Sequence, residues 1–187
     1  KLPLKFFNLS KDTFRLEGEK ILPTGKIIGA HEAEDFPLEL LKFTQLKELD
    51  LSSHHFRHIP EEIGKLEKLE ALYMFGNNFK EFPLALTKLS SLTKLQIAYN
   101  QIEKIPTADI LKMSKLEQLV LANNKIRLFP PDLLQLPKLT SGVSEEYSEY
   151  DKTLLNLDFR NNPIRNVPPE IIDKGYDAIF QYFESLQ

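Results

Sequence analysis

The chain has 187 residues, a formal net charge of -3 and no cysteine. This length suits a single domain, and the small acidic excess gives no overall attraction to nucleic acid or to an anionic membrane. Without cysteine there are no disulfides, no thiolate nucleophile and no cysteine-bound metal. No apolar run approaches the roughly 20 residues that a bilayer-spanning helix needs, so we predict no membrane insertion.

Residues 1–23 alternate loosely between apolar and polar side chains around two groups of turn-forming residues, 10–12 and 17–19. This pattern predicts short strands. Residues 24–45 fit the repeat that follows only poorly, and we interpret them as a degenerate first repeat. Residues 1–23 would then be an N-terminal cap, because the first unit of a stacked array has one face without a neighbour.

A pattern of apolar residues, one asparagine and one proline recurs along most of the remaining chain. In LEALYMFGNNFKEFP, residues 69–83, apolar side chains stand at offsets 0, 3, 5, 10 and 13 from Leu69, asparagine at offset 8 and proline at offset 14. Further copies begin at Leu46, Leu92, Leu116 and Leu154, the first with histidine in place of asparagine. Successive copies are 23 or 24 residues apart, except that the last begins 38 residues after its predecessor.

Each part of this pattern predicts a local structure. The first three apolar positions alternate with polar or small residues, which predicts a short parallel strand. After the proline, apolar pairs spaced by three, such as Ile63 and Leu66, predict a helical turn on the outer side. The asparagines should form a buried ladder, because their amides must bond backbone groups in the interior. The ladder residues are Asn77, Asn100, Asn124 and Asn162.

The LxxLxLxxNxL pattern resembles the leucine-rich repeat family in its 23-residue form. The proline after the second apolar pair, as in NNFKEFP, NQIEKIP and NKIRLFP, is most similar to the Ras-group, Shoc2-like class of intracellular repeats. The ending, Pro-Pro-Glu-Ile followed by glycine and an Ala-Ile-x-x-Tyr helix, is similar to bacterial repeat arrays and to those preceding the GTPase domain of Roco proteins. The resemblance implies a right-handed α/β solenoid of about six repeats over residues 24–170. Its parallel sheet would line the concave face of a horseshoe-like arc, with helical turns on the convex face.

An insertion separates the last two copies. Residues 140–153 carry four acidic side chains together with Tyr147 and Tyr150, and they come just before a predicted strand. They should therefore project from the rim of the solenoid, either as a tolerated surface insertion or as a second contact for a partner. Residues 171–187 have apolar side chains at helical spacing, which predicts a capping helix over the last repeat.

Strand residues that do not enter the core should line the concave face. Aromatic side chains cluster there, and clustered exposed aromatics are common anchors of protein interfaces. Acidic residues lie on one side of the cluster and basic ones on the other, which suits a partner with an apolar centre and a polarised rim. The predicted binding residues are Glu48, Asp50, Tyr73, Phe75, Gln96, Tyr99, Val120 and Arg160, with Lys125 on the basic rim.

The four histidines raise the question of a metal site. His31 and His54 occupy the asparagine position of adjacent repeats, where imidazole can donate from one nitrogen and accept at the other. Zinc would need three or four converging ligands, so we predict ladder residues and no metal. The chain also lacks the usual phosphate-loop, dinucleotide, zinc-protease and serine-hydrolase motifs. We therefore predict neither an enzyme nor a cofactor.

Together these features predict a non-catalytic protein-protein interaction module that binds a protein partner through its concave face, as a monomer or weak homodimer. Two alternatives remain open. The chain could be a regulatory or recognition segment of a larger signalling enzyme such as a Roco-type GTPase. It could also be a secreted bacterial protein that binds a host protein or glycan. A cytoplasmic location is favoured over a secreted or surface location in a bacterium.

Overall fold

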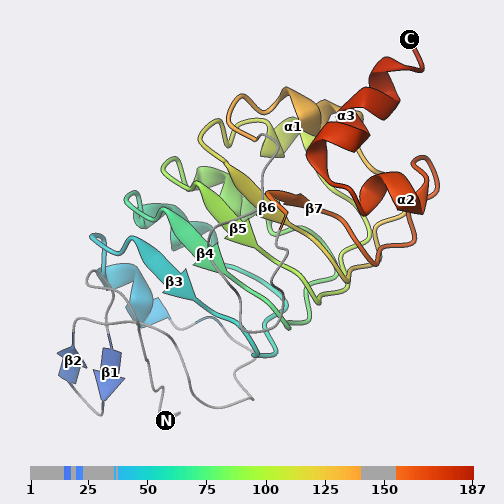
Figure 1. The fold of residues 1–187 in the computed structure, drawn as a ribbon. Coiled ribbons are helices and arrows are strands. Elements are labelled where there is room, and N and C mark those ends of the chain that lie inside the picture. The colour runs from blue at the N-terminus through green and yellow to red at the C-terminus, as the bar shows by residue number, and fades with distance from the viewer. Residues whose placement is uncertain (1–14, 18–19, 23–35, 37, 140–154) are drawn as a thin grey trace.

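The structure is a computed structural model that describes residues 15–17, 20–22, 36, 38–139 and 155–187 (Figure 1). The predicted α/β repeat solenoid is confirmed. A parallel sheet of five strands follows chain order: β3, Glu48–Asp50; β4, Ala71–Tyr73; β5, Lys94–Gln96; β6, Gln118–Val120; and β7, Leu157–Asp158. Ahead of it, β1, Arg15–Glu17, pairs antiparallel with β2, Lys20–Leu22, within the predicted N-terminal cap.

The five strands pair in a constant register, so equivalent residues of successive repeats stand side by side. Glu48 lies opposite Ala71, and Ala71 lies opposite Lys94. The row of leucines from Leu49 to Leu157 is buried. Because successive side chains of a strand point to opposite faces, this register separates core rows from concave rows along the whole sheet.

Short helices cover the other side of the sheet, where the sequence predicts helical turns. Four of them are 3-10 helices, labelled η: η1, Leu38–Lys42; η2, Glu61–Lys65; η3, Leu84–Lys88; and η4, Pro131–Gln135. The other, α1, Thr107–Ile110, is an α-helix. Proline has a fixed φ and no N–H, so it fits immediately outside a helix start. The repeat prolines take this cap position before η2, η3, α1 and η4: Pro60, Pro83, Pro106 and Pro130.

The hydrophobic core lies between the sheet and these helices and continues from repeat to repeat. Phe56, Phe79, Phe129 and Phe159 are among its largest fully buried side chains. The rings of Phe129 and Phe159 lie edge to face with their centroids 4.9 Å apart. Fully burying one such side chain contributes about 1.5–3 kcal/mol to the free energy of unfolding. Because the repeats bury these side chains against one another, stability depends mainly on contacts between adjacent repeats.

The predicted asparagine ladder is confirmed. Asn77 shows its geometry: Oδ1 accepts from the backbone N–H of Phe56 at 3.1 Å, and Nδ2 donates to the carbonyls of Leu51 and Met74 at 2.9 and 3.1 Å. Each amide therefore links the backbone of its own repeat to that of the preceding one. The same contacts recur at Asn100, Asn124 and Asn162.

His54 takes the ladder position of its repeat. It is 3% exposed, and its ring centroid lies 5.0 Å from that of Phe56. Its burial at this position agrees with the prediction of a ladder residue, and the predicted hydrogen bonding at both ring nitrogens stays a prediction. His31, predicted to play the same part in the degenerate first repeat, lies outside the described residues.

The C-terminal segment contains two short helices rather than the single helix predicted over residues 171–187. These are α2, Pro169–Ile172, and α3, Tyr176–Glu184. Gly175, between them, has a φ of 79°, a left-handed conformation that glycine adopts easily and that interrupts a helix. The break lets α3 lie against η4 and the last repeat, where the rings of Phe183 and Phe129 stack with centroids 5.8 Å apart.

Candidate functional site

The concave side of the sheet carries an aromatic pair, Phe75 and Tyr99. These residues follow strands β4 and β5, and their ring centroids lie 4.7 Å apart with an angle of 54° between the planes. Tyr99 is 54% exposed, and Phe75 is half-buried. Tilted ring pairs at this distance attract each other, so the two side chains form a preformed aromatic surface.

Phe75 also packs on an apolar cluster formed by Ala98, Val120 and Ala122. These three residues lie on the concave side, yet they are only 6%, 3% and 7% exposed. The prediction that Val120 belongs to an exposed patch is therefore wrong for this structure. Val120 is covered, and it supports the Phe75 ring through packing.

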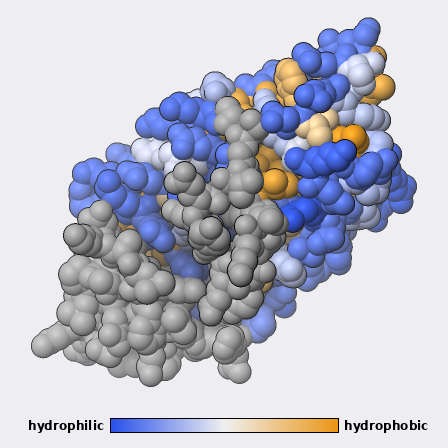
Figure 2. All heavy atoms as spheres, in the orientation of Figure 1, coloured by the Kyte–Doolittle hydropathy of each residue, from blue (hydrophilic) through white to orange (hydrophobic). Residues whose placement is uncertain are grey.

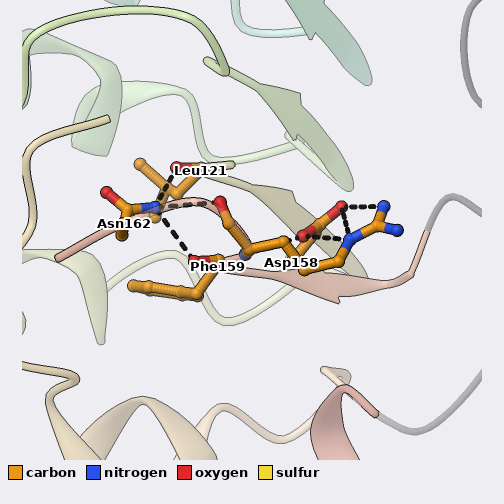
Figure 3. A network of polar contacts seen from close by, with 5 residues as sticks. Leu121, Asp158, Phe159 and Asn162 are labelled. Atoms are coloured by element: carbon orange, nitrogen blue, oxygen red, sulfur yellow. Dashed lines mark hydrogen bonds and ion pairs between the residues drawn. The ribbon is translucent and has the colours of Figure 1, made fainter. Parts of the chain in front are cut away.

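Asp158, the last residue of β7, forms an ion pair with Arg160, two residues beyond the strand (Figure 3). The Asp158 carboxylate is 1% exposed. It accepts from Arg160 Nη2 at 2.6 Å and from Nε and the backbone N–H of Arg160, both at 3.0 Å. We predicted Arg160 as a cation of the concave rim. Its charge is paired with a carboxylate two residues away, and its part in binding stays a prediction. Breaking so buried a pair would cost several kcal/mol.

The other predicted concave residues within the sheet are Glu48, Asp50, Tyr73 and Gln96. All four are half-buried. Asp50 Oδ1 accepts from the backbone N–H of Ser52 at 2.9 Å, the same contact that Asp158 makes with the N–H of Arg160. The first and last strands of the main sheet thus both carry an aspartate that caps the chain as it leaves the strand.

Sequence reasoning missed Gln118, which is 2% exposed on the concave side. Its Oε1 accepts from Gln96 Nε2 at 3.4 Å. The signal was present in the repeat pattern, because Gln118 stands in the same register row as Glu48. We predicted Glu48 of this row as a binding residue but did not follow the row to Gln118.

Five residues at the equivalent position after the strands have a positive φ. The values are 59° for Ser53, 65° for Gly76, 52° for Tyr99, 55° for Asn123 and 57° for Asn161. The repeat therefore imposes a left-handed backbone there, which small or amide residues tolerate and which costs a bulky residue about 1–2 kcal/mol. Tyr99 alone of the five is bulky, and its side chain is the exposed member of the aromatic pair.

Most of the coloured atoms in Figure 2 are hydrophilic, with apolar atoms near the position of β6 and β7 and around the C-terminal helices. Tyr147 and Tyr150, the predicted second contact, lie outside the described residues. Among the described residues no group of three or more histidine, aspartate or glutamate side chains could hold a metal ion. In these same ranges no helix is both long and apolar enough to cross a bilayer.

The chain is a repeat solenoid that carries a preformed aromatic surface on its parallel sheet. Repeat solenoids of this kind are a class of scaffold proteins. A sequence model of a leucine-rich repeat region matches residues 30–156. The chain belongs to the leucine-rich repeat family. Members of this family typically act as interaction modules rather than enzymes, and the family match supports a protein-interaction module here. No curated protein matches the chain.

Several solved structures share the fold. A leucine-rich repeat protein of Leptospira interrogans has 27% sequence identity and a TM-score of 0.57, with 75% of this chain and 38% of that one covered. Internalin C2 of Listeria monocytogenes has 25% identity and a TM-score of 0.52, covering 70% and 49%. The plant peptide hormone receptor RGFR1 in complex with RGF2 has 28% identity and a TM-score of 0.51, covering 68% and 19%. The chain thus matches less than half of each of these three proteins. Membership of its repeats in the Ras-group, Shoc2-like class stays a prediction.

Proposed function

We propose that this chain binds a protein partner through its concave face, without catalysis, and that Phe75 and Tyr99 anchor the partner. The observation that carries the proposal is the placement of Tyr99. Its ring is 54% exposed, and its backbone is left-handed at a position where the other repeats have serine, glycine or asparagine. The contact with Phe75 offsets part of this backbone cost but leaves much of the ring exposed, and exposed aromatic side chains are frequent hot spots of interfaces.

The fold supports the proposal in a general way. Leucine-rich repeats serve as interaction modules, and the plant receptor RGFR1, similar to this chain over 19% of its length, was solved with RGF2 bound. The half-buried residues Glu48, Asp50, Tyr73 and Gln96 would contact the partner beside the aromatic pair. Tyr147 and Tyr150 would form the second contact. The same face would serve the two alternatives, a segment of a larger signalling enzyme or a secreted bacterial protein.

The test is a pull-down that uses the wild-type chain and the Tyr99→Asn variant as baits in extracts of the organism that makes the protein. Asparagine removes the ring but tolerates the left-handed backbone, so the variant should remain folded. Leu84→Asn is the matched control, because Leu84 is 50% exposed on η3, on the opposite side of the sheet. Quantitative mass spectrometry identifies proteins that the wild type and the control retain and Tyr99→Asn does not.

Titration calorimetry with the purified partner then gives the dissociation constant. We expect Tyr99→Asn to weaken binding by about tenfold or more, the usual effect of removing a central aromatic anchor. Equal affinity of all three proteins would show that the partner binds elsewhere.

A further inference from the structure

The segments that follow the five parallel strands carry an excess of positive charge. These segments, residues 54–59, 77–82, 100–105, 124–129 and 162–167, contain six basic and two acidic residues, or 6 − 2 = +4, in a chain with a net charge of -3. The six basic side chains are exposed. They are Arg57, Lys80, Lys104, Lys125, Arg127 and Arg165, and we call this surface the basic edge.

Backbone hydrogen bonds hold these segments side by side. The N–H of Arg165 donates to the carbonyl of Arg127 at 3.0 Å, and the N–H of Glu103 donates to the carbonyl of Lys80 at 3.3 Å. Figure 1 shows the segments continuing beyond the strands to one edge of the solenoid, and Figure 2 shows that edge as hydrophilic. The basic edge is therefore one continuous surface.

Several lysines outside the basic edge pair with a carboxylate. Elsewhere, Lys47 pairs with Glu70 at 3.1 Å and Lys88 pairs with Glu61 at 2.6 Å. Across the described part of the chain, none of the six cations of the basic edge lies within 4.0 Å of a carboxylate oxygen. Their charge is directed to solvent and is available to a partner.

The basic edge adjoins the aromatic pair. Tyr99 bonds to the next repeat, its N–H donating to the carbonyl of Ala122 at 3.0 Å. Two residues beyond Tyr99, Gln101 Oε1 accepts from Lys125 Nζ at 3.5 Å. Lys125 therefore contacts the segment that follows Tyr99, at the border between the basic edge and the aromatic pair.

We propose that the basic edge binds an acidic segment of the protein partner while an apolar side chain of that segment contacts Phe75 and Tyr99. This inference rests on the proposed function and adds the chemistry of the partner. Five repeats span about 19 Å, a length that an extended segment of about six residues covers. Glu81 and Glu103 interrupt the positive charge. Nucleic acid or a sulfated glycan would place its uniform negative charge against them, whereas a peptide can position its carboxylates selectively.

Phage-displayed random peptides are first passed over immobilised Tyr99→Asn, and those that bind this variant are discarded. The remaining peptides are then selected on the immobilised wild-type chain of 187 residues. Selected peptides are synthesised with a fluorophore, and their affinities are measured by fluorescence anisotropy. The test variant is Arg127→Glu with Arg165→Glu. Lys65→Glu with Lys115→Glu is the matched control, because it changes the net charge equally at exposed positions outside the basic edge. Thermal unfolding by circular dichroism confirms that both variants fold, and Arg165→Gln replaces the double variant if that one unfolds.

We expect the selected peptides to combine an apolar residue with several aspartates or glutamates. The Arg127→Glu, Arg165→Glu variant should bind them about tenfold more weakly, and the control should change affinity by less than about twofold. Raising the salt concentration should weaken binding to the wild type more than to the charge-reversed variant.

Three results would overturn the inference. Peptides that depend on Tyr99 but carry no acidic excess would leave the proposed function standing and remove the role of the basic edge. Equal losses in both double variants, with heparin or single-stranded DNA competing as well as the peptides, would indicate a general response to charge. Recovery of no Tyr99-dependent peptide would exclude a linear acidic segment, and the pull-down with Tyr99→Asn would then decide separately whether a folded protein binds the concave face.

Discussion

Asn166 forms two hydrogen bonds with the backbone of Phe129 in the preceding repeat. Its Nδ2 donates to the Phe129 carbonyl at 2.8 Å, and its Oδ1 accepts from the Phe129 N–H at 2.9 Å. The Phe129 side chain is 1% exposed, so these backbone groups lie beside the core. The amide thus satisfies a donor and an acceptor that would otherwise be costly to leave unpaired.

Asn166→Ala should lower the free energy of unfolding by about 1–3 kcal/mol, because it removes both partners of Phe129. Urea denaturation followed by circular dichroism measures the change. Gln181→Ala is the control, since Gln181 is an exposed amide on α3, and it should change stability by less than about 0.5 kcal/mol. If Asn166→Ala were as stable as this control, water would be replacing the amide adequately.

Asn166 also shows what the sequence could not predict. The repeat pattern located the strands, the outer helical turns and the asparagine ladder, because each depends on spacing within one repeat and on burial that spacing predicts. Asn166 lies at a position that is histidine, glutamate, lysine and leucine in the other clear repeats. Nothing periodic distinguishes it, and its role arises from the last repeat alone.

The concave face was predicted less well than the core. Tyr99 lies on the concave side with an exposed ring, as the row assignment predicts, but burial of Val120 depends on packing with Phe75, Ala98 and Ala122. Spacing shows which way a side chain points and not what covers it. The pairing of Asp158 with Arg160 was accessible to reasoning, because the repeat pattern places both residues in rows that face the concave side.

His54 should be replaceable by the residue that the other repeats have at its position. His54→Asn places an amide in the ladder and should change the free energy of unfolding by less than about 1 kcal/mol. His54→Ala removes the side chain at a position that is 3% exposed, and should cost about 2–3 kcal/mol through lost packing. Chemical denaturation of both variants distinguishes them. Equal destabilisation by asparagine and alanine would mean that the imidazole ring itself is required, and that the ladder does not extend to this repeat.

Tyr176 should make the stability of the C-terminal cap depend on alkaline pH. Its hydroxyl donates to the carbonyl of Leu134 at 3.1 Å, and burial, together with the nearby carboxylate of Asp177, raises its pKa above the ordinary 10.0. The folded state therefore holds the hydroxyl proton more tightly than the unfolded chain does. This contribution to stability is complete below about pH 10 and is lost as the pH rises through the raised pKa.

The measurement is the free energy of unfolding of wild type and Tyr176→Phe between neutral pH and about pH 11. The wild type should be more stable at neutral pH, by about 1 kcal/mol for the hydrogen bond, and the difference should shrink at the alkaline end. Tyr99→Phe serves as the control, because it removes an exposed hydroxyl that is not part of the C-terminal cap. A constant difference between wild type and Tyr176→Phe at all pH values would show that the hydroxyl does not titrate with folding.

Substitutions at Tyr99 should separate the cost of its backbone from the contribution of its ring. Asparagine, glycine and alanine all remove the contact with Phe75, which is worth about 0.5–1.5 kcal/mol. At a φ of 52° asparagine and glycine relieve backbone strain, whereas alanine does not. Tyr99→Asn and Tyr99→Gly should therefore be more stable than Tyr99→Ala by about 1 kcal/mol, the reverse of the order usual where φ is negative.

Partner affinity should not follow the order of the stabilities. All three variants lack the ring, so they should bind the partner equally weakly. Chemical denaturation gives the stabilities, and calorimetry with the partner from the pull-down gives the affinities. The same three substitutions at exposed Lys115 provide the reference order for an ordinary backbone position. If alanine were the most stable residue at position 99, the left-handed backbone would carry no strain for a bulky residue, and the structural reason for assigning Tyr99 to binding would fail.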